Sequence, residues 1–244
     1  MTRYRALIEY DGTNYYGFQR QREEFPTIQG ELEDVLSQLA HKPVVITGAG
    51  RTDSGVHALG QVVSFTIEWR HGVAALNRAF NANLPGDIAA LTVEETSPAF
   101  HPRYDARRRA YRYLVYNRPV RSPLRRLRSW HIRRPLALDV MNEAAALLVG
   151  EHDFVTFGMP PQGDNTVREL FQANWRKRGE FLEFTVEANA FLYRMVRSLV
   201  GSLVAVGTQS WRVADFAAAF LACDRNRSAA AAPPQGLYLA SITY

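Results

Sequence analysis

The chain has 244 residues, with 29 Lys and Arg, 24 Asp and Glu, and a single Cys. Its length suits one large domain or two domains of about 100–140 residues, and a hydrophobic fraction of 47% is enough for folded cores, which argues against disorder. One Cys excludes an internal disulfide and every Cys-based zinc site, and no apolar run approaches the ~20 residues that span a bilayer. The first residues lack the apolar segment of a secretory signal, so the sequence predicts a cytoplasmic protein.

The first hundred residues alternate between strand and helix patterns. Apolar residues at every second position from Tyr4 to Tyr10 are typical of a strand. Thr27 is placed to cap a helix whose apolar face continues to Leu39. The later patterns predict a strand at Val44–Thr47, a strand at Gln61–Ile67, a helix at Val73–Ala82 and a strand at Ile88–Val93. The order β-α-β-β-α-β is that of the ferredoxin-like fold.

A glycine-rich segment, Gly48-Ala-Gly-Arg-Thr-Asp-Ser-Gly55, lies between two of these strands. Three glycines in eight residues predict a tight loop rather than regular structure. Asp53 follows Arg51 by two positions, so its carboxylate could act as a nucleophile or base while the Arg holds it ionised. The same pattern also fits an Asp that caps a turn beside a surface Arg. The segment matches neither the phosphate-binding loop nor the dinucleotide fingerprint.

The second half repeats the plan with longer insertions. Its patterns predict a strand at Arg109–Tyr116, a basic connection at Asn117–Pro135, a helix capped by Asp139 and ended at Gly150, a hairpin of Thr166–Arg176 and Phe181–Ala188 that turns at Gly179, helices at Phe191–Val206 and Val213–Ala222, and a closing strand at Gly236–Thr243. We therefore expect an α/β fold of the α+β type with domains at 1–104 and 105–244. We expect each domain to be ferredoxin-like or RRM-like. The antiparallel sheets of the two domains would lie side by side, with a central basic cleft that holds the active site.

Positive charge is concentrated in one window of the sequence. Between Arg103 and Arg134 there are twelve Arg and one acid, Asp105, so the window carries +11 and the rest of the chain −6. Such segregation favours a polyanionic partner, most readily nucleic acid, although a salt-bridged, solvated surface would give the same composition. A basic cleft lined by aromatic residues suits folded RNA.

Seven segments, in chain order, carry a family resemblance. They are Tyr10-Asp-Gly-Thr-Asn-Tyr-Tyr-Gly-Phe-Gln-Arg-Gln21, the loop continued to Val56-His57, Phe100-His-Pro-Arg-Tyr-Asp-Ala106 with Tyr111-Arg-Tyr113, Gly150-Glu-His-Asp-Phe154, Thr166-Val-Arg168, Ala188-Asn-Ala-Phe-Leu-Tyr-Arg-Met-Val-Arg197 and Gly236-Leu-Tyr-Leu239. Together they resemble the tRNA pseudouridine synthase A family, which modifies the anticodon stem-loop. The chain departs from many relatives at Tyr193-Arg194, where His-His is common, at Ser198 in place of Asn, and at Pro102 in place of Ala.

The resemblance implies an isomerase that converts uridine to pseudouridine at positions 38, 39 and 40 of tRNA. The base is cut from the ribose, rotated and rejoined through ring carbon 5. Breaking the glycosidic bond builds positive charge on the sugar, which a carboxylate can stabilise or trap. The resemblance implies no metal and no other cofactor. It implies as partners the anticodon stem-loop and elbow of tRNA and a second copy of the chain, with no membrane.

The resemblance also implies roles for individual residues. It makes Asp53 the catalytic carboxylate, with attack on the ribose or on the uracil ring left open. Tyr111 would stack on the target base, with removal of the carbon-5 proton as a further role, and Arg197 would pair with Asp53. The expected RNA contacts are Gln19, Arg51, Phe100, His101, Pro102, Arg103, Tyr104 and Tyr111. The expected phosphate contacts without base specificity are Arg118, Arg121, Arg125, Arg126 and Arg128.

Plainer interpretations remain for these residues. Tyr111 alone would fit a half-buried strand position, Arg197 a solvated helix position and Arg51 a surface ion pair. For His57 we favour structural hydrogen bonding over acid–base work, and residues 158–164 predict a loop near RNA. Two rival functions are a non-catalytic tRNA-binding chaperone of the same fold and a carbohydrate hydrolase. The hydrolase would need two cooperating acids, and only Asp53 lies in a suitable loop.

Overall fold

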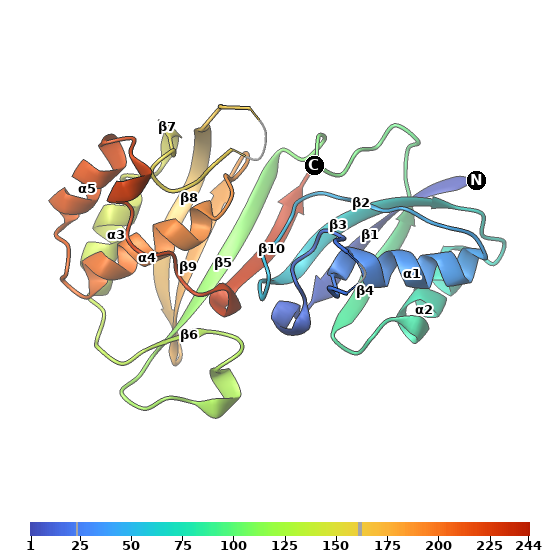
Figure 1. Cartoon of the computed structure of the whole chain (residues 1–244), viewed down its shortest axis with the longest axis horizontal. Helices are drawn as coiled ribbons and strands as arrows, with labels where there is room; N and C mark the ends of the chain where they lie inside the picture. Colours follow the sequence, from blue (N-terminus) through green and yellow to red (C-terminus); the bar gives the residue numbers. More distant parts are fainter. Residues whose placement is uncertain (23, 161–162) are drawn as a thin grey trace. The chain divides into compact units, whose positions relative to one another are not determined.

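The computed structural model describes residues 1–22, 24–160 and 163–244, and its elements are shown in Figure 1. Contacts divide the chain into unit 1, Met1–Arg107 with Tyr238–Tyr244, and unit 2, Arg108–Leu237. Within the described residues, no helix combines the length and the apolar character needed to cross a bilayer.

Unit 1 is built on an antiparallel sheet with two helices. Its elements are β1 (Thr2–Tyr10), α1 (Ile28–Ala40), β2 (Thr47–Gly48), β3 (His57–Ile67), α2 (Val73–Asn83), β4 (Ile88–Glu95) and, from the far end of the chain, β10 (Leu237–Thr243). The strands run in the order β4-β1-β3, with β2 antiparallel and β10 parallel to β3. The order β4-β1-β3-β2 confirms the ferredoxin-like arrangement that the sequence predicts for this half.

The core of unit 1 follows from the period-two pattern of β1. Tyr4, Ala6, Ile8 and Tyr10 are all buried, because alternate side chains of a strand point to one face of the sheet. The ring of Tyr4 stacks on Phe65 of β3, and Phe65 lies edge-on to Phe80 of α2. The N-terminus of α1 is capped as expected, because Thr27 Oγ1 accepts a hydrogen bond from the Gly30 N–H at 3.2 Å.

The expected strand at Val44–Thr47 is mostly absent, and its backbone donors explain why. The Val44 N–H donates to Ser37 Oγ at 2.9 Å, and the Ile46 N–H donates to a carboxylate oxygen of Glu33 at 3.1 Å. Both partners are side chains of α1, so this backbone is satisfied by the helix instead of by a sheet. Pairing with β3 begins only at Thr47 and includes Gly48, so the loop is one residue shorter than expected.

Unit 2 contains four strands that pair antiparallel, in the order β5-β9-β8-β7. Its elements are β5 (Arg108–Asn117), β6 (Trp130–Ile132), α3 (Leu138–Ala146), β7 (Gly150–Asp153), β8 (Val167–Arg178), β9 (Phe181–Ala188), α4 (Met195–Gly207) and α5 (Val213–Leu221), with short 3₁₀ helices at Pro123–Arg125, Arg225–Arg227 and Pro234–Gly236. The hairpin of β8 and β9 turns at Gly179, whose φ of +58° suits glycine. The mainly antiparallel strands and the helices of each unit confirm the expected fold class, a mixed α/β fold.

Two helix starts in unit 2 differ from the expectation. Helix α4 begins at Met195 and not at Phe191, because Tyr193 exchanges two backbone hydrogen bonds with Met159 and Arg194 takes a left-handed φ of +61°. Helix α3 begins after Ala137, so Asp139 lies inside its first turn and is not the cap. A carboxylate in that first turn still favours the helix, because it faces the positive end of the helix dipole.

The patterns missed the short strands of unit 2. β6 lies inside the basic connection and pairs in parallel with the end of β5. β7 starts at Gly150, where a helix end was expected. Of the predicted loop at 158–164, residues 161 and 162 lie outside the described residues.

Candidate active site and RNA-contact residues

The loop that carries Asp53 is fixed to its neighbours through backbone and hydroxyl groups. The Phe18 N–H donates to the Thr52 carbonyl oxygen at 3.1 Å, and the Thr52 hydroxyl lies 2.8 Å from the buried Tyr10 hydroxyl. The Val56 N–H closes a turn on the Asp53 carbonyl oxygen at 3.1 Å. Asp53 itself is half-buried, so its backbone is held while its side chain is partly open to solvent.

Tyr15 ties the residues after Asp53 to the start of the chain. Its carbonyl oxygen accepts hydrogen bonds from Ser54 Oγ at 3.1 Å and from the Gly55 N–H at 3.3 Å. Its own hydroxyl donates to Asp87 at 2.7 Å. Burial and then this carboxylate raise the pKa of Tyr15, so the phenol stays protonated and keeps its donor role.

Two glycines allow the segment from residue 12 to residue 18 to lie directly against this loop. Gly17 has a φ of +95°, and a Cβ added there would lie 2.7 Å from the Thr52 carbonyl oxygen. A Cβ at Gly12 would collide with the carbonyl oxygen of Val56. Side chains at either position would therefore push the loop away.

His57 has the structural role that the sequence favours. Its ring is buried, and Nδ1 accepts a hydrogen bond from the Gly12 N–H at 3.1 Å. The same nitrogen lies 3.0 Å from Asp11 Oδ1. The two contacts need different protonation of Nδ1. When Nδ1 has no proton and Nε2 carries it, Nδ1 can accept from the Gly12 N–H; when Nδ1 is protonated, it can donate to Asp11. Either form fastens the end of the loop to the turn after β1.

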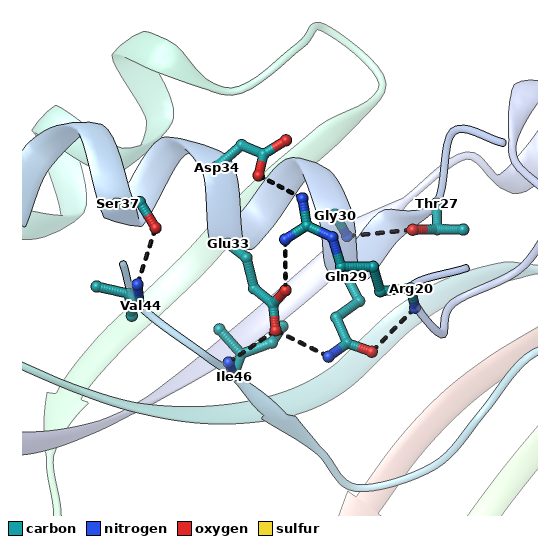
Figure 2. Close-up of polar contacts among 9 residues, drawn as sticks. All are labelled: Arg20, Thr27, Gln29, Gly30, Glu33, Asp34, Ser37, Val44 and Ile46. Atoms are coloured by element: carbon teal, nitrogen blue, oxygen red, sulfur yellow. Dashed lines mark hydrogen bonds and ion pairs between the residues drawn. The ribbon is translucent and has the colours of Figure 1, made fainter. Parts of the chain in front are cut away.

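A buried carboxylate on α1 fixes both approaches to the loop, as Figure 2 shows. Glu33 is 4% exposed and accepts hydrogen bonds from Arg20 at 2.8 Å, from Gln29 at 2.8 Å and from the Ile46 N–H at 3.1 Å. Arg20 also bonds Asp34 at 2.7 Å. Arg20 follows the 12–18 segment and Ile46 precedes β2, so one helix positions the chain on both sides of the Asp53 loop.

The expected RNA-contact segment after β4 is an ordered turn. The N–H of His101 donates to Asp105, and the N–H of Asp105 donates back to the His101 carbonyl oxygen, both at 3.0 Å. The His101 ring lies against Tyr104, with 4.2 Å between centroids, and the Arg103 guanidinium lies over the Tyr104 ring, 5.8 Å from its centroid. Tyr104 is 73% exposed. The turn thus presents an aromatic ring beside a cation at the surface, a combination that suits stacking of a nucleobase.

The start of this turn is anchored inside unit 1. The ring of Phe100 packs on Tyr244 with 5.0 Å between centroids, and the Tyr244 hydroxyl donates to the Pro102 carbonyl oxygen at 2.9 Å. Arg3 Nε donates to the Phe100 carbonyl oxygen at 3.0 Å. Phe100 and Pro102 therefore support the turn, while Gln19 and Arg51, elsewhere in unit 1, are exposed.

In unit 2, Tyr111 and Tyr113 lie on one face of β5, because they are two residues apart on a strand. Tyr111 is 9% exposed, and its ring meets Phe191 edge-on with 5.0 Å between centroids. Tyr113 is fully buried and donates its hydroxyl to the Pro233 carbonyl oxygen at 2.8 Å. Burial raises the pKa of Tyr113, and the guanidinium of Arg197 opposes that rise.

Arg197 occupies the first turn of α4. Its Nε donates to the Ala232 carbonyl oxygen at 2.8 Å, and the Ala232 N–H donates back to the Arg197 carbonyl oxygen at 2.9 Å. A cation at the positive end of a helix is unfavourable by itself, and it adds to the positive potential there. The pairing with Ala232 aims the guanidinium, and the local field suits an anionic group.

Comparison with known proteins then supplies the family. A family model described as tRNA pseudouridine synthase matches residues 6–105 and 144–244. The chain belongs to the tRNA pseudouridine synthase family. Proteins named tRNA pseudouridine synthase A from Methylocella silvestris, Pseudothermotoga lettingae and Shewanella piezotolerans are 44%, 41% and 41% identical to it. These matches cover 100%, 100% and 97% of this chain and 99%, 100% and 91% of the three relatives.

Membership confirms the family resemblance and an isomerase, and it does not favour the non-catalytic chaperone. In this pseudouridine synthase, Asp53, Arg51, Gln19 and the Phe100–Tyr104 turn belong to unit 1 and lie within the first matched range. Arg197 lies within the second matched range, whereas Tyr111 and the basic connection lie between the two. In unit 2, Tyr113 and Arg197 bind the adjacent residues Pro233 and Ala232, and Tyr111 lies two residues before Tyr113 on β5.

The sequence did not point to several residues that hold the candidate site residues in place. Tyr10, Thr52 and Glu33 hold the Asp53 loop, and Tyr113 carries the hydroxyl that meets Pro233. The period-two pattern identified Tyr10 as core but gave no sign of its polar partner. The signal that was available is the spacing of Gly12 and Gly17, since two glycines in six residues mark close backbone approach.

Proposed function

We propose that this protein isomerises uridine to pseudouridine at positions 38, 39 and 40 in the anticodon stem-loop of tRNA. In the reaction the bond between ribose C1′ and uracil N1 breaks, the base turns, and a bond from C1′ to C5 forms. N1 ends with a proton, and C5 loses one. The observation that carries the proposal is the full-length similarity to proteins named tRNA pseudouridine synthase A, together with a half-buried Asp53 on a fixed loop.

Asp53 is the catalytic carboxylate of the proposed reaction. Attack on ribose C1′ or on the uracil ring uses the same ionised group, and a fixed backbone keeps its oxygens at one place. Support comes from the hydrogen bonds that the Phe18 N–H donates to the Thr52 oxygen and the Val56 N–H donates to the Asp53 oxygen, and from the partial exposure of Asp53.

Tyr111 and Arg197 complete the proposed catalytic set, Tyr111 under the extruded base and Arg197 paired with Asp53. Support comes from the adjacent contacts of Tyr113 with Pro233 and of Arg197 with Ala232, since Tyr111 lies on the same face of β5 as Tyr113. Flipping the uridine costs a few kcal/mol of lost stacking, which an aromatic ring and a cation offset.

The remaining proposed contacts bind RNA rather than act on it. Gln19, Arg51 and the turn of Phe100, His101, Pro102, Arg103 and Tyr104 contact the substrate around the target. Phosphates as far as the elbow of the tRNA are contacted by five arginines of the basic connection, Arg118, Arg121, Arg125, Arg126 and Arg128. We propose domains at 1–104 and 105–244, a homodimer and a cytoplasmic location. Sedimentation with and without tRNA measures the oligomeric state.

The test uses the purified protein and an unmodified tRNA transcript with uridines at 38, 39 and 40. Chemical mapping should find pseudouridine at these positions without added metal or coenzyme. Asp53→Ala should bind the transcript with the affinity of the unmodified protein and form no pseudouridine. Binding without any pseudouridine from the unmodified protein contradicts the proposal and revives the chaperone.

A further inference from the structure

We propose that a hollow beside the end of β5 binds an unstacked nucleotide of the tRNA, at a site separate from the reacting uridine. The inference deepens the proposed function, and rests on it for the identity of the RNA. The hollow has a volume of about 620 Å³ and lies wholly in unit 2. Its walls include Tyr116, Trp130, His131, Arg121, Arg125 and Arg126. Volumes of roughly 300–1,000 Å³ are typical of small-molecule sites.

The position of the hollow separates it from the proposed catalytic face. Tyr116 stands five residues after Tyr111 on β5, which is roughly 17 Å along a strand. Arg121, Arg125, Arg126, Trp130 and His131 also fall between the two ranges that the family model matches. Two further lining residues, Pro233 and Gln235, lie within the second matched range. The basic connection therefore supplies the guanidinium groups of the hollow, and a segment of the family supplies part of its wall.

Two of the three arginines that line the hollow have no acidic partner among the described residues. No acidic side chain is among the described residues that line it. Arg125 is compensated, since it lies 3.6 Å from Glu180 and over the ring of Phe181 at 5.5 Å. Arg121 and Arg126 are exposed, and neither has a side-chain hydrogen bond or ion pair with any residue the structure describes. Two such guanidinium groups favour phosphate oxygens, to which Arg binds through two parallel hydrogen bonds.

The rings that line the hollow stand on an ordered frame. The parallel pairing of β5 with β6 sets Tyr116 opposite His131, and their ring centroids are 5.7 Å apart. His131 Nε2 lies 2.8 Å from the Arg118 carbonyl oxygen, and Ser129 Oγ donates to the Arg125 carbonyl oxygen at 3.0 Å. Because these contacts are all within the protein, the walls of the hollow are held in place and little ordering is needed when a ligand arrives.

Aromatic walls beside free guanidinium groups match one ligand chemistry best. A nucleotide offers a flat base for Tyr116 or Trp130 and phosphates for Arg121 and Arg126, and stacking of this kind is worth about 1–3 kcal/mol per base. Stacking is tolerant of base identity, so the hollow would hold an unstacked nucleotide in tRNAs of different sequence. That property suits an enzyme that acts on many tRNAs.

The test compares two pairs of substitutions that remove the same charge. Arg121→Gln with Arg126→Gln changes the hollow, whereas Arg133→Gln with Arg134→Gln changes two exposed arginines of the same connection that do not line it. We expect the first pair to weaken tRNA binding and raise KM about tenfold with kcat unchanged, and to lower the slope of log Kd against log salt by about 1–2. The second pair should change KM by about twofold or less. Equal effects of the two pairs would overturn the proposal, because general attraction would then explain both.

A third variant tests the stacking itself. Trp130→Ala should raise Kd about tenfold with little change in the salt slope, while Trp130→Phe keeps a ring and should restore most of the affinity. Thermal unfolding shows whether the Trp130→Ala protein has lost its fold. If it has, the tRNA affinity of the Trp130→Phe variant is the test of stacking. Wild-type affinity in both Trp130 variants overturns the proposal. A change in sedimentation of the double Arg121/Arg126 variant without RNA also overturns it, because the hollow would then belong to a contact between copies of the chain. Pseudouridine formation by the unmodified protein in the same assay reports separately on the proposed function.

Discussion

The loop around Asp53 and the basic connection from Asn117 to Pro135 are both irregular segments, and they are stabilised in opposite ways. The first has its backbone fixed by Phe18, Tyr15 and a close glycine contact, and it carries one half-buried acid. The second has exposed arginines, several without a partner among the described residues, over a frame of rings.

The difference indicates a division of work. A group that must act on one bond needs a position defined to a fraction of an ångström, which fixed backbone contacts provide. Groups that bind phosphates act through charge over several ångströms and tolerate movement, so their side chains can stay exposed. The two segments should therefore respond differently to substitution, one in kcat and the other in Kd and its salt dependence.

The largest expected effect is that of Asp53→Asn, which removes charge and keeps shape. We expect kcat to fall at least ~10³-fold, because removal of a group used in the chemical step costs on this order or more. The Kd for tRNA should stay within about threefold of the unmodified value. Single-turnover assays and filter binding measure the two quantities, and a variant with weak binding but normal kcat would reverse the comparison.

Gly17→Ala tests whether the loop depends on a close backbone approach. With a φ of +95° and a Cβ 2.7 Å from the Thr52 oxygen, the alanine must move the loop, and we expect a loss of about 2–3 kcal/mol of unfolding free energy. The kcat should fall about 10–100-fold as Asp53 moves with the loop. Denaturant unfolding and steady-state kinetics measure these effects.

Gly50→Ala is the matched control in the same loop. A Cβ there meets nothing within 4 Å among the described residues, and its φ is not in the left-handed range. We expect a change within about 0.5 kcal/mol and near-normal kcat. Equal losses in the two variants would mean that the loop is generally fragile and not held at Gly17.

Glu33→Ala should loosen both approaches to the Asp53 loop. The Ile46 N–H loses its carboxylate acceptor and Arg20 loses its buried partner, so we expect about 2–3 kcal/mol of lost unfolding free energy. Asp34→Ala removes the exposed partner of the same Arg20 and should cost about 0.5 kcal/mol or less, because exposed ion pairs contribute little. If urea unfolding finds equal losses, the burial of Glu33 is not what matters.

The regular elements of unit 1 could be predicted from sequence because their patterns are strong. The alternation from Tyr4 to Tyr10 and the cap at Thr27 each report a local preference that the fold keeps. The strand at Val44–Thr47 failed for a non-local reason: Ser37 and Glu33 of α1 take the N–H groups of Val44 and Ile46. No periodicity reports a side chain that replaces a strand partner.

The family resemblance identified the candidate site residues, but it did not identify the residues that hold them in place. Asp53 and Arg197 stand in recognisable segments, whereas the contacts from Tyr10, Glu33 and Ala232 join residues from 13 to 42 positions apart. The same limit applies to the basic connection, where composition alone gave Arg118 and Arg125 the same role. Only the fold separates the arginine beside Glu180 from the one without such a partner.

The smallest expected effect is the difference in tRNA binding between Arg118→Gln and Arg108→Gln. Arg108 lies 2.9 Å from Glu187 and over the ring of Phe171 at 4.2 Å, so its charge is already engaged within the protein. Arg118 is exposed and has no side-chain partner among the described residues. Arg118→Gln should raise the Kd for tRNA about two- to threefold and lower the salt slope by somewhat less than 1, as expected for one phosphate contact.

Arg108→Gln should leave the Kd and the salt slope within error, although both variants change the net charge equally. A salt titration of binding from about 50 to 200 mM resolves the slopes, since screening over this range is strong for exposed charges. If the two variants weaken binding equally, net charge alone determines the affinity for tRNA. The partner of each arginine within the protein would then not predict whether that arginine contacts RNA. If only Arg118 matters, the basic connection binds through particular side chains, and its unpaired arginines mark where the phosphates lie.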